Sequence, residues 1–273
     1  MKELICIGTS FTWGDGVCTE RDSKLIKLYK ERYGVDVSRK THSFPSILEK
    51  LSGIKTRNVG KCGSSIEYLI RNVEELLETE DLSNTKLILE YSNWGRSELY
   101  WVKGKKYVIA NWGHRNGEDI TNGFESCITE DYAHQFDNTP YTQSNLNSIM
   151  EVYDKYLDEF HDEKLYMIQS DRSFLNLLYK LSAKNIDFVI VPLQHYFWPE
   201  MELDTIVTDN HITFKNGDND YYGLESYCGH YGLRTMDLIS DVEPHNDNGH
   251  PSIHGYDMIA NVIYKNLKEN GTI

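Results

Sequence analysis

The sequence has no long apolar run, few cysteines and fewer basic than acidic residues. No stretch approaches the roughly 18 consecutive apolar residues that a membrane-spanning helix needs. The first apolar run, Leu4–Ile7, is too short for the core of a signal peptide and is soon followed by polar residues. We therefore expect no signal peptide or transmembrane segment, and a protein that stays in the cytoplasm or is carried in a virion.

Charge and cysteine usage narrow the classes of partner and fold. The chain has 28 Lys and Arg against 42 Asp and Glu residues, a formal net charge of -14. This sign disfavours a nucleic-acid backbone or an anionic membrane as the main partner. The 5 cysteines are odd in number and no two are spaced C-x-x-C, so we expect reduced thiols that mostly serve packing.

Strand and helix patterns alternate from one end of the chain to the other. Short apolar runs predict strands over 3–9, 86–91 and 187–193. A further strand is expected over 55–59, and a short fifth near Arg234–Leu238. Helical spacing predicts helices over 43–52 with Ser43 as a cap, from Ile66 onward, within 145–183 as one or two helices, and over 252–268. The alternation predicts an α/β fold, a three-layer α/β/α sandwich around a central parallel sheet of about five strands.

Two segments interrupt this alternation. Residues 95–144 contain a predicted hairpin, with strands around Leu99 and Tyr107 separated by Gly104, and then a polar stretch. Residues 195–232 are similarly irregular and rich in aromatics. Long loops at strand ends commonly shape binding sites. Because the chain has no repeat or clear linker, we expect 1–273 to be one domain with two insertions.

Three polar or glycine positions follow predicted strands. They are Ser10, Gly63 and Asn93. Ligands of parallel sheets bind beyond the carboxyl ends of the strands, where these three positions would meet. The convergence predicts a functional site at that edge.

A nucleophile, a base and an orienting carboxylate are available at the two ends of the chain. A serine hydroxyl such as Ser10 becomes nucleophilic only when a neighbouring base takes its proton. His250 can serve as that base, since an imidazole has an ordinary pKa near 6.5. Asp247 precedes it by three residues and can hold the other ring nitrogen. The backbone N–H groups of Ser10 and Gly63 and the side-chain amide of Asn93 are candidate oxyanion donors.

Four blocks of this chain resemble the SGNH (GDSL-type) hydrolase superfamily. They are Gly8-Thr9-Ser10-Phe11-Thr12-Trp13-Gly14, Asn58-Val59-Gly60-Lys61-Cys62-Gly63, Tyr91-Ser92-Asn93-Trp94 and Asp247-Asn248-Gly249-His250-Pro251. Thr9 departs from the Asp usual in the family, and Tyr91 and Trp94 replace its Gly and Asp. A register one residue away would place Ser92 or Trp94 at the asparagine position. The resemblance is to divergent members such as those of phage and large-virus genomes.

This resemblance implies a flavodoxin-like serine hydrolase that needs no metal or other cofactor. Ser10, His250 and Asp247 would form the triad, and an acyl-enzyme would be the intermediate. The expected substrate is a short acyl ester, such as an O-acetyl group on a carbohydrate, against which Trp13, Trp94 and Tyr196 could present aromatic faces.

Two other functions remain open from the sequence. The chain could be a non-catalytic glycan-binding or structural module that retains the fold. A cluster of metal-ligating side chains could instead support a zinc-dependent hydrolase; its members are His245, Asp247, His250 and His254. The zinc alternative gives no role to Ser10 or Gly63.

Overall fold

The computed structural model describes most of the chain outside the two insertions. The described residues are 1–14, 17, 23–61, 63–91, 96–101, 106–111, 155, 159, 162–193, 204–216, 219–221, 223–234 and 250–273. Their strands are β1 (Glu3–Ile7), β2 (Lys55–Asn58), β3 (Thr85–Tyr91), β4 (Arg96–Trp101), β5 (Lys106–Asn111), β6 (Asp187–Pro192), β7 (Phe214–Asn216) and β8 (Asn219–Tyr221). Their helices are α1 (Ser10–Trp13), α2 (Ser23–Tyr33), α3 (Arg39–His42), α4 (Phe44–Ser52), α5 (Ile66–Thr79), α9 (Glu163–Ala183), α11 (Thr205–Thr208), α12 (Leu224–His230) and α14 (Ile253–Glu269).

A parallel sheet of four strands forms the centre of the described structure, in the order β2-β1-β3-β6. Each neighbouring pair is parallel, and Cys6 of β1 lies opposite Asn58 of β2 and Ile88 of β3. All seven residues of β3 are buried. A strand buried on both faces belongs in the middle of a layered α/β fold.

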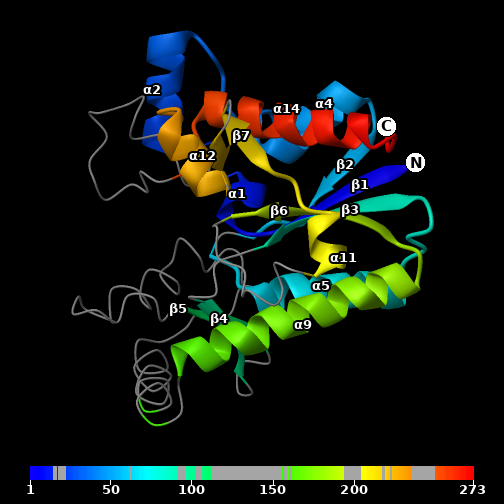
Figure 1. Ribbon diagram of the computed structural model, residues 1–273. Coiled ribbons are helices and arrows are strands. Elements are labelled where there is room, and N and C mark those ends of the chain that lie inside the picture. Colours follow the sequence, from blue (N-terminus) through cyan, green and yellow to red (C-terminus); the bar gives the residue numbers. More distant parts are fainter. Residues whose placement is uncertain are drawn as a thin grey trace.

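Side chains alternate between two cores, one on each face of the sheet. Leu4, Cys6 and Ile88 pack in one core with residues of α4 and α14. Ile5, Leu87 and Leu89 pack in the other, with residues of α5 and α9. Figure 1 shows α4 and α14 over one face and α5 and α9 over the other. This arrangement is the three-layer α/β/α fold class expected from the sequence.

The helices follow from amphipathic spacing and polar caps. In α5, the buried positions Ile66, Leu69, Val73 and Leu76 recur every three or four residues. Ser65 caps this helix by accepting a hydrogen bond from the backbone N–H of Tyr68 at 3.3 Å. Ser43 occupies the N-cap of α4 as expected, but its hydroxyl bonds that of Ser46 at 3.0 Å instead of a backbone N–H.

The hairpin expected in the first insertion is confirmed. Strands β4 and β5 are antiparallel, with Leu99 opposite Val108. Arg71 of α5 donates two hydrogen bonds to the Glu98 carboxylate of β4, from Nε at 2.9 Å and from a terminal nitrogen at 2.8 Å. The Glu98 side chain is only 2% exposed, so this two-pronged pair fastens the hairpin to the body of the fold.

Three further expectations from the sequence concern the fifth strand, the cysteines and membrane-spanning helices. Arg234 forms an isolated antiparallel bridge with Pro251, whereas the rest of the fifth strand expected there lies outside the described residues. Cys6 and Cys228 are buried free thiols. In the described ranges, no helix is both long and apolar enough to cross a membrane.

Candidate active site

Ser10 lies where the first strand ends and the first short helix begins. Strand β1 ends at Ile7, and α1 starts at Ser10 after the turn Gly8-Thr9. The backbone N–H groups of Trp13 and Gly14 donate to the carbonyls of Thr9 and Ser10 at 2.8 and 3.0 Å. This tight turn holds Ser10 at the carboxyl edge of the sheet, where its side chain is almost wholly buried.

The structure brings His250 into direct contact with Ser10. The Nε2 atom of His250 lies 2.6 Å from the Ser10 Oγ atom, although the residues are 240 positions apart. A neutral imidazole with its proton on Nδ1 accepts the serine proton at Nε2. The expected meeting of the first and last sequence blocks is therefore present in the geometry.

Contacts at the start of the last helix position His250. The Pro251 bridge to Arg234 and the hydrogen bond from the Ser252 N–H to the Leu233 carbonyl, at 2.8 Å, anchor the segment. The Ser252 hydroxyl then caps α14 by accepting from the Gly255 N–H at 3.2 Å. The imidazole also packs against Phe11, with 5.2 Å between the ring centroids. His250 thus belongs to a short, restrained connection into α14.

The loop after β2 is tied to the Ser10 turn at several points. The Lys61 N–H and the Ser64 hydroxyl both donate to the Gly8 carbonyl, at 2.9 and 3.0 Å. The Asn58 side chain donates to the Thr12 carbonyl at 2.8 Å. Gly63 follows in the same loop with φ +74°, a conformation that glycine adopts without strain. Ser10 and Gly63 therefore lie on two loops of the same edge, as expected.

Gly60 is where the two loops come closest together. A Cβ atom at this position would lie 2.4 Å from the Trp13 backbone nitrogen and 2.7 Å from the Thr12 carbonyl carbon. Neither neighbour is a flexible side chain, so a larger residue would have to push the loops apart. The glycine of the second block is therefore required by close backbone approach.

Lys61 adds a partly desolvated cation beside this edge. Burial lowers its pKa to about 8, although the Glu98 carboxylate opposes the shift and Arg71 reinforces it. Its ammonium lies 5.3 Å from the centroid of the Tyr68 ring. Sequence reasoning did not single out Lys61, because its burial depends on α5 and the hairpin packing around it.

Glu90 is a second residue that sequence reasoning missed. It is the penultimate residue of β3, is 0% exposed and contacts the Ser10 turn through Thr9 and Thr12. Desolvation raises its pKa above the ordinary value of 4.5, against the lowering effect of hydrogen bonds from Thr12 and Thr9. A single acidic residue in the apolar run 87–91 was the available signal, since buried carboxylates are rare unless paired.

Several predicted site residues lie outside the described part of the chain. They are Asp247, Asn93, Trp94, Tyr196 and the His245 of the zinc alternative. Of the others, Trp13 is partly buried and the Arg39 guanidinium lies 3.4 Å from the centroid of its ring. His254 is exposed on α14, where its ring meets that of Tyr33 edge to face.

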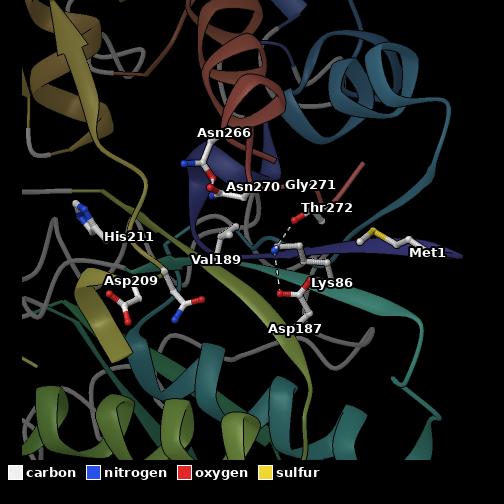
Figure 2. Close-up of a pocket in the computed structure, with 11 residues that line it drawn as sticks. Met1, Lys86, Asp187, Val189, Asp209, His211, Asn266, Asn270, Gly271 and Thr272 are labelled. Atoms are coloured by element: carbon white, nitrogen blue, oxygen red, sulfur yellow. Dashed lines mark hydrogen bonds and ion pairs between the residues drawn. The ribbon is translucent and has the colours of Figure 1, made fainter. Parts of the chain in front are cut away.

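A polar pocket of about 460 Å³ opens at the opposite edge of the sheet. Its lining includes Lys86 and Asp187 at the amino ends of β3 and β6, together with Asn266, Asn270 and Thr272 at the end of α14 (Figure 2). Because all four strands of the sheet are parallel, Ser10 at the carboxyl end of β1 lies on the far side. Lys86 and Glu90 are about 13 Å apart along β3 at a rise of about 3.3 Å per residue. The pocket is therefore separate from the Ser10–His250 pair.

Comparison with known proteins gives similarities in solved structures only. No family model and no curated protein matches the sequence. A member of the lipolytic protein G-D-S-L family from Veillonella parvula is 12% identical, with 97% of each chain covered and a TM-score of 0.36. An acetyl xylan esterase from Butyrivibrio proteoclasticus is 11% identical over 100% of this chain and 65% of its own, with a TM-score of 0.43. A family two carbohydrate esterase from Clostridium thermocellum, solved with cellohexaose, is 10% identical over 100% and 65% of the two chains, with a TM-score of 0.40.

The strand order and the contact between the first and last blocks agree with the SGNH hydrolase resemblance found in the sequence. Chemically, the arrangement places a hydroxyl and an imidazole at hydrogen-bonding distance, which is the geometry of an activated serine nucleophile. It does so at the strand edge where parallel sheets bind ligands.

Proposed function

We propose that the chain is a serine esterase of the SGNH type, with Ser10 as nucleophile and His250 as general base. The single observation that carries the proposal is the 2.6 Å distance between the Ser10 Oγ and His250 Nε2 atoms. The contact joins the only two sequence blocks that were expected to supply a nucleophile and a base.

The reaction proceeds by two acyl transfers. Ser10 Oγ attacks the ester carbonyl while its proton passes to His250 Nε2, and the alcohol leaves with that proton. Water then attacks the acyl-serine while His250 accepts its proton. The bond from the acyl carbon to Ser10 Oγ breaks, His250 returns the proton to Oγ, and the carboxylic acid is released. We propose Asp247 as the residue that holds Nδ1 and keeps Nε2 free to accept.

The tetrahedral intermediates need donors for their oxyanion. We propose the backbone N–H groups of Ser10 and Gly63 and the side-chain amide of Asn93 for this role. The hydrogen bonds of Lys61 and Ser64 to the Gly8 carbonyl support it, because they hold the Gly63 loop against the Ser10 turn. Loss of one such donor typically lowers kcat by about 10²–10³-fold.

The proposed substrate is a short acyl ester, such as an O-acetyl group, on a carbohydrate. Trp13, three residues after Ser10 in α1, is partly buried and supplies an aromatic surface close to the nucleophile in the sequence. The insertions supply further aromatics, with Trp94 and Tyr196 as the proposed contacts to sugar rings. A small acyl group suits a nucleophile as deeply buried as Ser10.

An ester panel tests the proposal. Wild-type protein and Ser10→Ala are assayed on acetyl, butyryl and octanoyl 4-nitrophenyl esters and on an O-acetylated oligosaccharide, each with and without a chelator. We expect wild-type hydrolysis fastest on acetyl esters, none with Ser10→Ala and no effect of the chelator. Oligosaccharide binding without hydrolysis would favour the binding module, and chelator-sensitive activity restored by zinc would favour the metal enzyme.

A further inference from the structure

Glu90 is a buried carboxyl group placed directly behind the turn that carries Ser10. Alternation along β3 puts Lys86, Ile88 and Glu90 on one face, and Ile88 belongs to the core that contains α14. The Glu90 side chain has no exposed surface. No salt bridge to it is present in the described part of the chain.

The two carboxylate oxygens of Glu90 each hold a different end of the Ser10 turn. Oε1 accepts hydrogen bonds from the Thr9 N–H, at 3.2 Å, and from the Thr9 hydroxyl. Oε2 accepts from the Thr12 N–H, at 2.7 Å, and from the Thr12 hydroxyl. An ionised carboxylate has about four acceptor sites, so these donors match its capacity.

The backbone is shaped to bring this carboxylate close. A Cβ atom at Gly8 would lie 2.4 Å from the Glu90 Cβ atom and 2.7 Å from Glu90 Oε2. Glycine at position 8 therefore lets β1 pass against the Glu90 side chain. One carboxylate then spans the segment Thr9–Thr12, and Ser10 lies between its two attachment points.

Stability alone does not account for a carboxylate at this position. Desolvation raises the pKa of Glu90 in spite of its hydrogen bonds to Thr12 and Thr9, so burial costs the ionised group more than those bonds return. An apolar side chain would fill the same core without this cost. A buried titratable group kept at a net cost beside a nucleophile is typical of a functional constraint.

We propose that Glu90 is a positioning residue for Ser10: through Thr9 and Thr12 it fixes the turn that presents the serine hydroxyl to His250. This inference rests on the proposed esterase function. Glu90 does not touch the substrate; it sets the orientation of Ser10. A misplacement of about 1 Å at a reacting group can lower a rate about 10²-fold.

Glu90→Gln tests the role with little change in shape. The amide replaces one accepting oxygen by a donor and so opposes the N–H and hydroxyl of one threonine. We expect kcat on 4-nitrophenyl acetate to fall about 10- to 100-fold with KM within about twofold of wild type. The rate at which a fluorophosphonate labels Ser10 should fall in parallel.

Lys86→Gln is the matched control. It also replaces a buried charged side chain by an amide, on the same strand and face, but at the amino edge. We expect its kcat and labelling rate to stay within about twofold of wild type. Equal losses of kcat in Glu90→Gln and Lys86→Gln would mean that either change only loosens β3, and would overturn the proposal.

A second pair of variants covers the case in which Glu90→Gln fails to fold. Thr12→Val keeps the shape of the side chain but removes the hydroxyl that donates to Glu90, whereas Thr12→Ser retains a hydroxyl. We expect Thr12→Val to lower kcat about tenfold and Thr12→Ser to restore it to within about threefold of wild type. Wild-type kcat and labelling rate in Thr12→Val would overturn the proposal.

The outcomes separate this inference from the esterase proposal. A wild-type protein that hydrolyses esters and is labelled at Ser10, with folded Glu90→Gln equally active, overturns only the role of Glu90. A wild-type protein that is neither active nor labelled overturns both.

Discussion

Lys86 and Glu90 lie near opposite ends of β3, on the same face of the strand, and both are almost wholly buried. Lys86 Nζ lies 2.9 Å from the Asp187 carboxylate, which is 53% exposed, and 3.1 Å from the Thr272 hydroxyl. Glu90 instead takes its hydrogen bonds from the two threonines that flank Ser10. At its amino end the strand therefore carries a buried lysine paired with a half-exposed carboxylate, and at its carboxyl end a buried glutamate.

The two edges of the sheet differ in the same way. The amino edge contains the polar pocket of about 460 Å³, in which Lys86 is neutralised by Asp187. The carboxyl edge holds the Ser10–His250 pair and the loops tied to it. The contact between a hydroxyl and an imidazole at the carboxyl edge is therefore the basis of the proposed chemistry.

The largest contrast at the carboxyl edge is between two histidines four residues apart. We expect His250→Ala to lower kcat on an acetyl ester by about 10⁴-fold or more, because the general base is lost. His254→Ala should leave kcat within about twofold, since that imidazole is exposed on α14 and the hydroxyl of Ser10 contacts His250. Steady-state kinetics on an acetyl ester measures kcat for both variants and for the wild type. Comparable losses in the two would favour the zinc cluster over the serine mechanism.

Two glycines, one at each edge of the sheet, should respond differently to substitution by alanine. Gly60→Ala forces a Cβ atom to within 2.4 Å of the Trp13 backbone nitrogen, so the β2 loop must move away from the Ser10 turn. We expect kcat to fall about 10- to 100-fold and the free energy of unfolding to fall by about 1–3 kcal/mol.

Gly271→Ala is the counterpart at the amino edge. Gly271 has φ +65° but open space around it, so alanine should cost about 1 kcal/mol of stability and leave kcat unchanged. Urea unfolding and ester hydrolysis on both variants check the pair. A large loss of kcat in Gly271→Ala would show that the two edges are coupled.

The last expected effect is a pH dependence of stability that comes from Lys61. Because burial lowers its pKa to about 8, the folded chain loses the Lys61 proton before the unfolded chain does. Below pH 8 the amine is charged in both states, and the cost of burying the charge is fully present. That cost should decline as pH rises from 8 toward the ordinary pKa of 10.5, so wild-type stability rises relative to Lys61→Met.

The matched control for Lys61→Met is Lys61→Arg, which stays charged across this range. The free energy of unfolding of Lys61→Arg relative to Lys61→Met should therefore stay flat between pH 8 and 10. Urea titrations at several pH values measure both differences. If the free energy of unfolding of the wild type relative to Lys61→Met also stays flat over this pH range, the desolvation of Lys61 is contradicted.

The parts of the fold that were predictable are those set by local patterns. The positions of β1, β3 and β6 followed from apolar runs, α5 followed from its helical spacing, and the β4–β5 hairpin followed from two β-rich runs around Gly104. The approach of Ser10 and Gly63 was predictable because the carboxyl ends of parallel strands share an edge. The contact of Ser10 with His250 was predictable from the chemistry of the first and last blocks and from their resemblance to SGNH hydrolases.

The unpredicted parts depend on contacts between distant segments. Glu90 is tolerable inside β3 only because donors from residues 9 and 12 reach it, 81 and 78 positions away in the chain. Lys61 is desolvated by packing with α5 and the hairpin. Contacts of this kind produce no local periodicity in the sequence. For Glu90, the sequence signal is an acidic residue within an apolar run.

The most direct test of the central claim is to locate the covalent adduct of a fluorophosphonate by peptide mass spectrometry. We expect one adduct per chain on Ser10, formed much more slowly in His250→Ala than in the wild type and at the wild-type rate in His254→Ala. An intact chain without adduct, or an adduct on another residue with Ser10 unmodified, would contradict it.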